Sequence, residues 1–124
     1  MTQNTLEKLI DLAQRYPDDP VIMCGLAEAY ARNRDFMKAS SLYRKIIQLK
    51  PDYPAAYGEL GKMLALSRKT REAIPVIQKG IEVAETTGDL QALKNMKAFL
   101  RRLEKSIPPR KAFRPSTVSL PKRG

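Results

Sequence analysis

The residues that most often perform acid–base or metal chemistry are scarce in this chain. It has no histidine, which removes the commonest general base and the commonest metal ligand. Its single cysteine, Cys24, excludes an internal disulfide and a cysteine cluster for zinc. The six glycines are scattered and form no phosphate-binding loop. We therefore expect a protein that is not an enzyme and that needs no metal or cofactor.

The remaining reactive groups have ordinary structural explanations. Asp18, Asp19 and Asp52 each stand beside a proline, where Asp is a common turn or helix-capping residue. Cys24 has no cationic neighbour in the sequence that would activate its thiol, so we expect a small, partly buried apolar residue. Pro75 falls near the start of an expected helix, where the loss of one backbone donor is tolerated.

The sequence repeats itself with a period of 34 residues. Pro17-Asp18-Asp19-Pro20 returns as Pro51-Asp52-Tyr53-Pro54. Between these segments the first copy has Met23, Leu26, Ala27, Tyr30, Ala39, Tyr43, Ile46 and Pro51, at the offsets where the second has Tyr57, Leu60, Gly61, Leu64, Ala73, Ile77, Gly80 and Glu85. A fixed period of this length indicates a solenoid of repeated helical units, which offers a binding surface more often than a catalytic pocket.

This pattern resembles the tetratricopeptide repeat, in which an aromatic residue is followed by Leu-Gly, Tyr, Ala, a second aromatic and a closing Pro. The second copy supplies Leu60-Gly61 and Ala73, whereas the first supplies Tyr30, Ala39, Tyr43 and Pro51. Two departures are visible. Met23 and Tyr57 stand where the family has Trp, and Glu85 replaces the closing Pro of the second copy.

The resemblance implies an all-α, right-handed superhelical solenoid of antiparallel helix pairs. We expect a half-unit over residues 1–17, full repeats over 20–53 and 54–87, and a capping helix over 89–106. Small residues are expected where paired helices cross closely, at Ala27, Ala39, Gly61 and Ala73. The capping helix has an apolar stripe of Leu90, Leu93, Met96, Leu100, Leu103 and Ile107.

Length and composition fit one domain of this kind. The chain has 124 residues and is 43% hydrophobic, which is enough for a packed core. It has no apolar run long enough to span a bilayer. The segment Met1-Thr2-Gln3-Asn4 lacks the basic start and apolar stretch of a secretory signal, so we expect a cytoplasmic protein.

In this family the first helix of each unit lines the concave face, which implies a set of groove residues in this chain. They are Val21, Cys24, Gly25, Glu28, Arg32, Ala55, Gly58, Glu59, Lys62 and Leu66. Members that hold the C-terminal carboxylate of heat-shock chaperones use Lys and Asn on these helices, whereas this chain has Cys24, Glu28 and Glu59. The groove suits a segment with apolar and basic groups. An equal alternative is that these charges only solvate the inner face.

Positive charge gathers toward the C-terminus. The net charge is +10, from 23 Lys and Arg against 13 Asp and Glu. Residues 107–124 form a Pro-rich tail without an acidic residue, which is expected to be disordered. Cations that could make electrostatic contacts are Lys94, Lys97, Arg101, Arg102 and Lys105 on the capping helix, and Arg110, Lys111, Arg114, Lys122 and Arg123 in the tail.

The sequence therefore predicts an adaptor or scaffold that binds a protein segment in its groove, with the basic region as an auxiliary contact. One alternative is a nucleic-acid- or ribosome-associated protein that works through its basic helix and tail. Another is a self-assembling subunit, in which the solenoids stack end to end. The tail itself is either an electrostatic arm, a short recognition segment or only a solubilising terminus.

Overall fold

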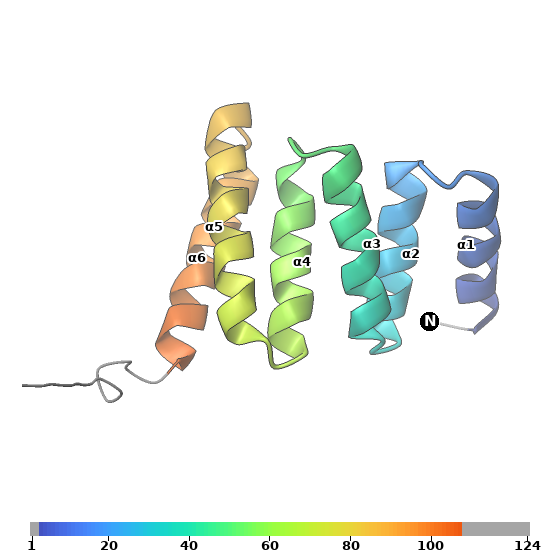
Figure 1. Ribbon diagram of the computed structural model, residues 1–124, viewed down its shortest axis with the longest axis horizontal. Helices are drawn as coiled ribbons and strands as arrows, with labels where there is room; N and C mark the ends of the chain where they lie inside the picture. The colour runs from blue at the N-terminus through green and yellow to red at the C-terminus, as the bar shows by residue number, and fades with distance from the viewer. Residues whose placement is uncertain (1–2, 108–124) are drawn as a thin grey trace, which may run out of the picture.

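The computed structural model describes residues 3–107, and these residues form six α-helices and no strand. Their bounds are α1 Gln3–Arg15, α2 Pro20–Arg32, α3 Phe36–Leu49, α4 Pro54–Leu66, α5 Thr70–Thr87 and α6 Leu90–Ser106. Each helix packs on the next and runs antiparallel to it, so that the row extends from α1 to α6 (Figure 1). This arrangement confirms the expected all-α solenoid of helix pairs. The tail beyond Ile107 lies outside the described residues.

Aspartates and prolines of the repeat start the helices where the sequence indicates. Asp19 is the N-cap of α2, and its carboxylate accepts from the Val21 N–H at 2.9 Å and from the Ile22 N–H at 3.4 Å. Pro20 occupies the first turn, where its missing N–H costs nothing. Asp35 and Asp89 cap α3 and α6 in the same way.

The end of α5 departs from the 34-residue period. α5 has 18 residues, whereas its counterpart α3 has 14. Gly88 ends α5 in the left-handed conformation (φ 78°), and the N–H groups of Gly88 and Asp89 both donate to the Ala84 carbonyl. As a result α6 begins 36 residues after α4, at Leu90 compared with Pro54.

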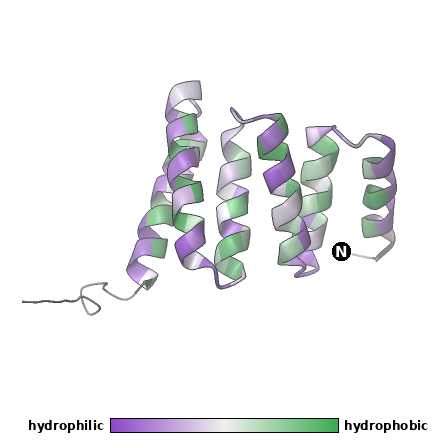
Figure 2. Cartoon of the chain, in the orientation of Figure 1, coloured by the Kyte–Doolittle hydropathy of each residue, from purple (hydrophilic) through white to green (hydrophobic). Residues whose placement is uncertain are grey.

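A continuous core runs from α2 to α6, and a smaller cluster joins α1 to α2 through Leu6, Leu26 and Ala29. The largest fully buried side chains are Met23, Tyr43, Ile46 and Ile77. Along each helix hydrophobic and hydrophilic residues alternate in bands, which gives every helix an apolar side for its neighbours (Figure 2). Leu90, expected in the apolar stripe of α6, is 73% exposed and is the first residue of that helix.

The helices of the second pair cross at Gly61. A Cβ atom built on Gly61 would overlap Cδ1 and Cγ1 of Ile77 on α5 and would lie 3.7 Å from the Ala73 carbonyl. Ala73 and Ile77 are themselves fully buried. The absence of a side chain at Gly61 therefore sets how closely α4 and α5 approach.

A second close contact joins three helices at Gly80. A Cβ atom on this residue of α5 would lie 2.5 Å from Tyr57 Cβ on α4 and 2.6 Å from Met96 Sδ on α6. Tyr57 is fixed in turn by its hydroxyl, which donates to the Pro51 carbonyl at 2.7 Å. Because Gly80 leaves room for Met96, α6 packs against both α5 and α4.

The contact at Gly61 gives a first prediction. Gly61→Ala should lower the free energy of unfolding, because overpacking costs about 1–3 kcal/mol and outweighs a helix-propensity gain of about 1 kcal/mol. In an Ile77→Ala background the overlap is removed, so the same change should be neutral or stabilising. Urea denaturation of the four proteins measures both effects. An equal cost in both backgrounds would show that Gly61 and Ile77 do not meet as described.

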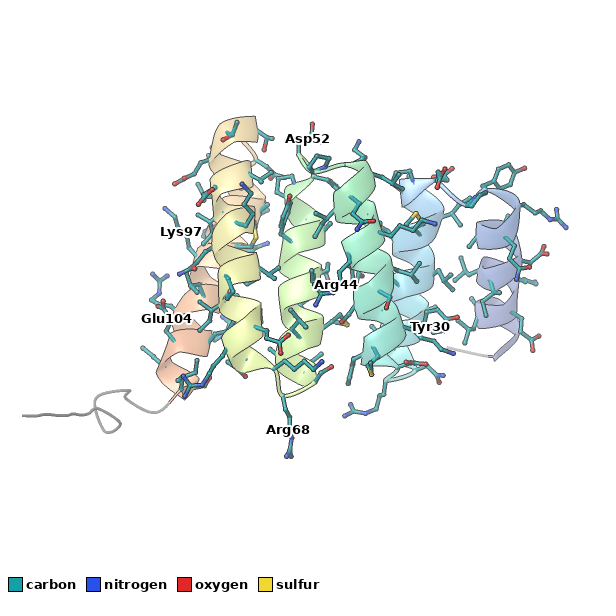
Figure 3. All side chains as sticks on the ribbon, in the orientation of Figure 1. Tyr30, Arg44, Asp52, Arg68, Lys97 and Glu104 are labelled. Carbon is teal, nitrogen blue, oxygen red and sulfur yellow. The ribbon has the colours of Figure 1, made fainter. Side chains whose placement is uncertain are left out.

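The turns inside the two repeats give a second prediction. Arg34 and Arg68 occupy equivalent turns and both have left-handed backbones, with φ of 63° and 66°. This conformation costs a non-glycine residue about 1–2 kcal/mol, and Arg68 projects away from the helices (Figure 3). Arg68→Gly should therefore raise the free energy of unfolding by about 1 kcal/mol.

Arg101→Gly is the matched control, because Arg101 is exposed in the interior of α6. There the same substitution should cost about 1 kcal/mol of stability. Thermal or urea denaturation distinguishes the two signs. Destabilisation of similar size in both variants would contradict a left-handed turn at Arg68.

Candidate functional site

Two adjoining depressions lie between α4 and α6. The larger, of about 490 Å³, is lined by Gly58, Glu59 and Lys62 of α4 and by Asn95, Met96, Ala98, Phe99 and Arg102 of α6. The smaller, of about 270 Å³, extends toward the start of both helices, where Pro54, Ala55, Asp89, Gln91 and Ala92 join the lining. Gly58, Glu59, Asn95 and Met96 belong to both. The depressions therefore form one groove along the two helices, called here the inner groove.

The floor of the inner groove depends on Gly58. A Cβ atom on Gly58 would lie 3.4 Å from Met96 Cγ, which is an ordinary van der Waals separation, so an alanine would fit against Met96. A larger residue than alanine at this position would fill the groove. The inner groove is thus open at Gly58, where the residue has no side chain.

The inner groove carries both signs of charge. The Nζ atom of Lys62 lies 3.7 Å from Oε2 of Glu59, and both side chains are about half exposed. On the facing helix the Arg102 guanidinium lies over the Phe99 ring, 5.6 Å from its centroid. An exposed pair such as Glu59–Lys62 is worth little by itself. Both charges can therefore exchange partners when a ligand binds.

Toward α2 the surroundings become acidic. Burial is the main cause that raises the pKa of the half-buried Cys24 thiol, and Glu28 and Glu59 raise it further, whereas a hydrogen bond with Tyr53 acts in the opposite direction. Burial also raises the pKa of the Tyr43 hydroxyl, and again Glu59 and Glu28 add to the effect. The two carboxylates come from different helices but act on the same two groups. They therefore create one negative region between α2 and α4.

The structure brings together only some of the residues expected to line the groove. Ala55, Gly58, Glu59 and Lys62 line the depressions against α6. Cys24 and Glu28 lie on the α2 side, next to Tyr53 and within electrostatic reach of Glu59.

The other expected groove residues line neither depression. Val21, Arg32 and Leu66 are exposed. Gly25 faces α1, since a Cβ atom there would lie 3.5 Å from Cδ2 of Leu9.

The wall that α6 contributes was not predicted from the sequence, because this helix was expected to be a cap. A signal was present. With the offset of 36 residues between the helix starts, Met96 corresponds to Leu60 and Leu100 to Leu64, so α6 repeats the apolar spacing of α4. α6 thus occupies the place of the first helix of a further unit, and its residues Asn95, Met96 and Phe99 face the groove.

The basic residues of α6 are all exposed but divide into two groups. Arg102 lines the inner groove, whereas Lys94, Lys97, Arg101 and Lys105 line neither depression. Within residues 3–107 no ion pair involves α6. The other expected electrostatic residues, Arg110, Lys111, Arg114, Lys122 and Arg123, lie outside the described residues.

The described part of the chain also has two negative findings. Across residues 3–107, His, Cys, Asp and Glu side chains nowhere gather in a group of three or more that could hold a metal ion. None of the helices α1 to α6 combines the length and the apolar character needed to cross a membrane.

The acidic region around Cys24 gives a third prediction. Because its pKa is raised, Cys24 of the native protein should react with iodoacetamide more slowly than the urea-unfolded chain at the same pH. The native rate should keep rising above pH 8.5, the ordinary thiol pKa. Glu28→Gln should accelerate the native reaction, because it removes one charge that opposes ionisation. Equal native and unfolded rates, or no effect of Glu28→Gln, would contradict this environment.

Comparison with known proteins supports the repeat. No family model matches the chain. A TPR repeat-containing protein of Pseudomonas aeruginosa is 28% identical over 101 residues, which cover 82% of this chain and 96% of that relative. A peroxisomal targeting signal receptor of Eremothecium gossypii is 29% identical over 82 residues, which cover 65% of this chain and only 14% of the receptor.

Solved structures show the same architecture. A tetratricopeptide repeat domain protein from Salinibacter ruber superposes with a TM-score of 0.70 at 27% identity, covering 75% of this chain and 94% of that structure. The TPR2B domain of yeast Sti1, solved as its pHsp70 complex, has a TM-score of 0.77 over 84% of this chain and 83% of its own; at 14% identity it shows the fold alone. The 34-residue repeat, the packed helix pairs and these similarities show that the chain has the fold of tetratricopeptide-repeat proteins.

Proposed function

We propose that this protein is a non-catalytic adaptor that binds a protein segment in the inner groove. The observation that carries the proposal is the groove itself, which joins an open apolar floor at Gly58 and Met96 to charged groups on both walls. Some proteins of the same fold have been solved with a peptide bound. One is the first TPR domain of Spaghetti, which was solved with an HSP90 peptide. No enzyme family is indicated by the relatives.

The ligand of this chain should differ in charge from that neighbour's peptide. The HSP90 peptide has the sequence SRMEEVD, whose C-terminal half is acidic. Glu28 and Glu59 would repel such a segment, because like charges facing each other across an interface are unfavourable. A segment that combines Lys or Arg with apolar side chains would instead place its cations between the two carboxylates and its apolar groups on Met96 and Phe99.

A second candidate function rests on the outer side of α6. Lys94, Lys97, Arg101 and Lys105 are exposed, and in residues 3–107 none of them has an acidic partner. Such a row suits the phosphate backbone of a nucleic acid, and the affinity of that contact would fall steeply with salt. The basic region as an auxiliary contact for a protein ligand, and end-to-end assembly of the solenoid, stay predictions from the sequence.

The fourth prediction tests the adaptor against these alternatives. Selection of a random peptide library on the immobilised full chain should enrich, among its binders, a class of peptides that combines basic and apolar residues. The Glu28→Lys/Glu59→Lys variant should bind a selected peptide about tenfold more weakly or worse, because both carboxylates become cations. Fluorescence anisotropy measures the affinity, and circular dichroism confirms that the helices are retained.

Glu85→Lys/Glu104→Lys is the matched control, since it makes the same change in net charge at exposed positions outside the groove. It should bind the peptide like the wild type. If the groove variant keeps its affinity while neutralisation of Lys94, Lys97, Arg101 and Lys105 abolishes binding to a single-stranded RNA probe at low salt, the nucleic-acid function replaces the adaptor.

A further inference from the structure

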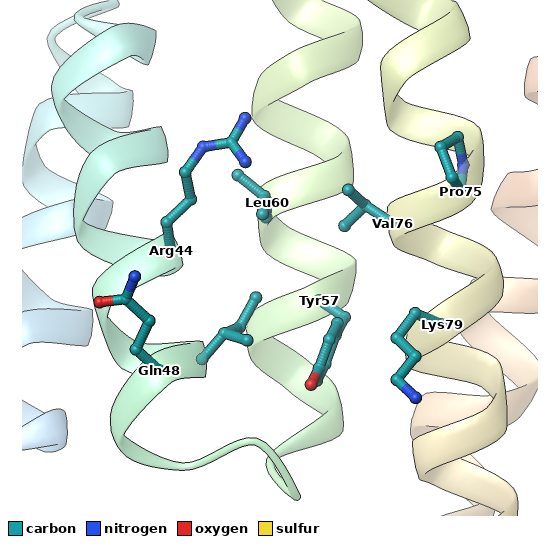
Figure 4. Close-up of a pocket in the computed structure, with 8 residues that line it drawn as sticks. Arg44, Gln48, Tyr57, Leu60, Pro75, Val76 and Lys79 are labelled. Carbon is teal, nitrogen blue, oxygen red and sulfur yellow. The ribbon is translucent and has the colours of Figure 1, made fainter.

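A second cavity, of about 410 Å³, lies on the other side of α4. Its walls come from α3 and α5, with Arg44, Ile47 and Gln48 on one side and Pro75, Val76 and Lys79 on the other (Figure 4). Tyr57 and Leu60 of α4 form its floor. By helical periodicity these two residues point away from Gly58, Glu59 and Lys62, which line the inner groove. This cavity, called here the outer groove, is therefore a separate surface.

The 34-residue register explains why the outer groove is open. One period earlier, Arg44 corresponds to Ile10, Leu60 to Leu26, and Val76 to Leu42. Those three earlier residues belong to one hydrophobic cluster, in which Ile10 of α1 and Leu42 of α3 pack around Leu26. In the later unit an arginine stands in place of the isoleucine, and its charged end cannot be buried among apolar groups without a partner. The equivalent space, bounded by Ile47, Val76 and Leu60, is the open outer groove.

The charges around the outer groove have one sign. Arg44 and Lys79 stand on opposite walls, and every other lining residue is neutral. Arg44 has no acidic partner in the part of the chain that the structure describes. Lys79 pairs with Glu82 at 3.6 Å, but both side chains are more than half exposed, so a ligand carboxylate can compete for the ammonium group.

Between its two cations the outer groove has an apolar surface. Pro75 is exposed within α5, and its ring presents an apolar surface with no side-chain freedom to lose. With Ile47 and Val76 it surrounds a space in the size range of small ligand pockets, about 300–1,000 Å³. This arrangement can take a bulky apolar side chain between two cations. The basic tail of this chain, with its five Lys and Arg and no acidic residue, has the wrong charge to occupy it.

We propose that the outer groove is a second protein-binding site, whose occupant is an acidic segment of a partner protein with a bulky apolar side chain flanked by carboxylates. The apolar side chain enters between Ile47 and Val76 above Leu60. The carboxylates on either side meet Arg44 and Lys79. This site is independent of the inner groove, and its ligand has the opposite charge.

The test uses the full chain and a defined probe, a fluorescein-labelled peptide of sequence Asp-Glu-Leu-Phe-Glu-Asp. Anisotropy should show saturable binding of this probe, and its affinity should fall about tenfold or more in Arg44→Glu/Lys79→Glu. A peptide with Lys in place of the acidic residues should not bind at this site. A peptide with Ala-Ala in place of Leu-Phe should bind at least about tenfold more weakly, because the apolar contact is lost.

Two controls separate this site from the rest of the surface. Arg101→Glu/Lys105→Glu makes the same change in net charge on exposed positions of α6 and should keep wild-type affinity for the acidic probe. Glu28→Lys/Glu59→Lys should also keep it, whatever happens at the inner groove. In the unmutated protein, methyl signals of Ile47 and Val76 in NMR spectra should shift on titration with the acidic probe, which maps the site without relying on any variant.

Several results would overturn the proposal. Failure of the acidic probe to bind, or loss of its binding in the α6 control variant rather than in Arg44→Glu/Lys79→Glu, would place no acidic ligand in the outer groove. Methyl shifts confined to residues of the inner groove would do the same. If the free protein is a dimer that Arg44→Glu/Lys79→Glu dissociates in analytical ultracentrifugation, while the acidic probe does not bind, the occupant is a second copy of this chain and the proposed partner is wrong.

Discussion

The solenoid depends on helices that approach until backbone touches side chain. At Gly61 the room that a methyl group would need is taken by Ile77, and at Gly80 it is taken by Tyr57 and Met96. These two glycines join α4, α5 and α6 into one packed unit. Glycine weakens a helix interior by roughly 0.5–1 kcal/mol relative to alanine. Its presence at both crossings therefore indicates that the contact stabilises the fold by more than this local cost.

These small residues at the helix crossings also explain which parts of the fold could be predicted from the sequence. Small residues at a fixed spacing are visible in the sequence, and they predicted the all-α solenoid and the burial of Ala27, Ala39, Gly61 and Ala73, which the structure confirms. The left-handed turns at Arg34 and Arg68 were not predictable in this way. Arginine gives no local signal for that conformation, which the packing of the flanking helices imposes.

The candidate site was predicted less completely than the fold, and the reason is a shift of register. α5 runs beyond the length of α3, so the pattern of α4 recurs in α6 after 36 residues instead of 34. A constant period of 34 residues therefore predicts Gly58 and Glu59 on the α4 wall of the inner groove. It does not predict Asn95 and Met96 on the α6 wall. The outer groove was missed for a different reason. Its lining includes Arg44 at the position where the earlier unit has an isoleucine, and this difference becomes informative only beside the packed cluster around Leu26.

The two proposed grooves use opposite sides of one helix and opposite charges. Residues of α4 that are one position apart, Gly58 and Tyr57, take part in different surfaces because successive residues of a helix are rotated by about 100°. A single helix can in this way hold a basic segment against Glu59 and an acidic segment below Arg44 and Lys79.

The net charge of +10 does not contradict a negative region between α2 and α4, because charges separated by more than about 8 Å are largely screened at physiological salt. At low ionic strength the positive charge of the whole chain steers the encounter with a partner, whereas retention is decided by the few charges within each groove. A polyanionic or acidic partner is attracted from a distance and meets local cations in the outer groove. A basic segment gains no such attraction, so its binding to the inner groove must come from short-range contacts with Glu28, Glu59 and the apolar floor. In the proposed arrangement the long-range attraction that brings a ligand is thus separate from the short-range contacts that hold it.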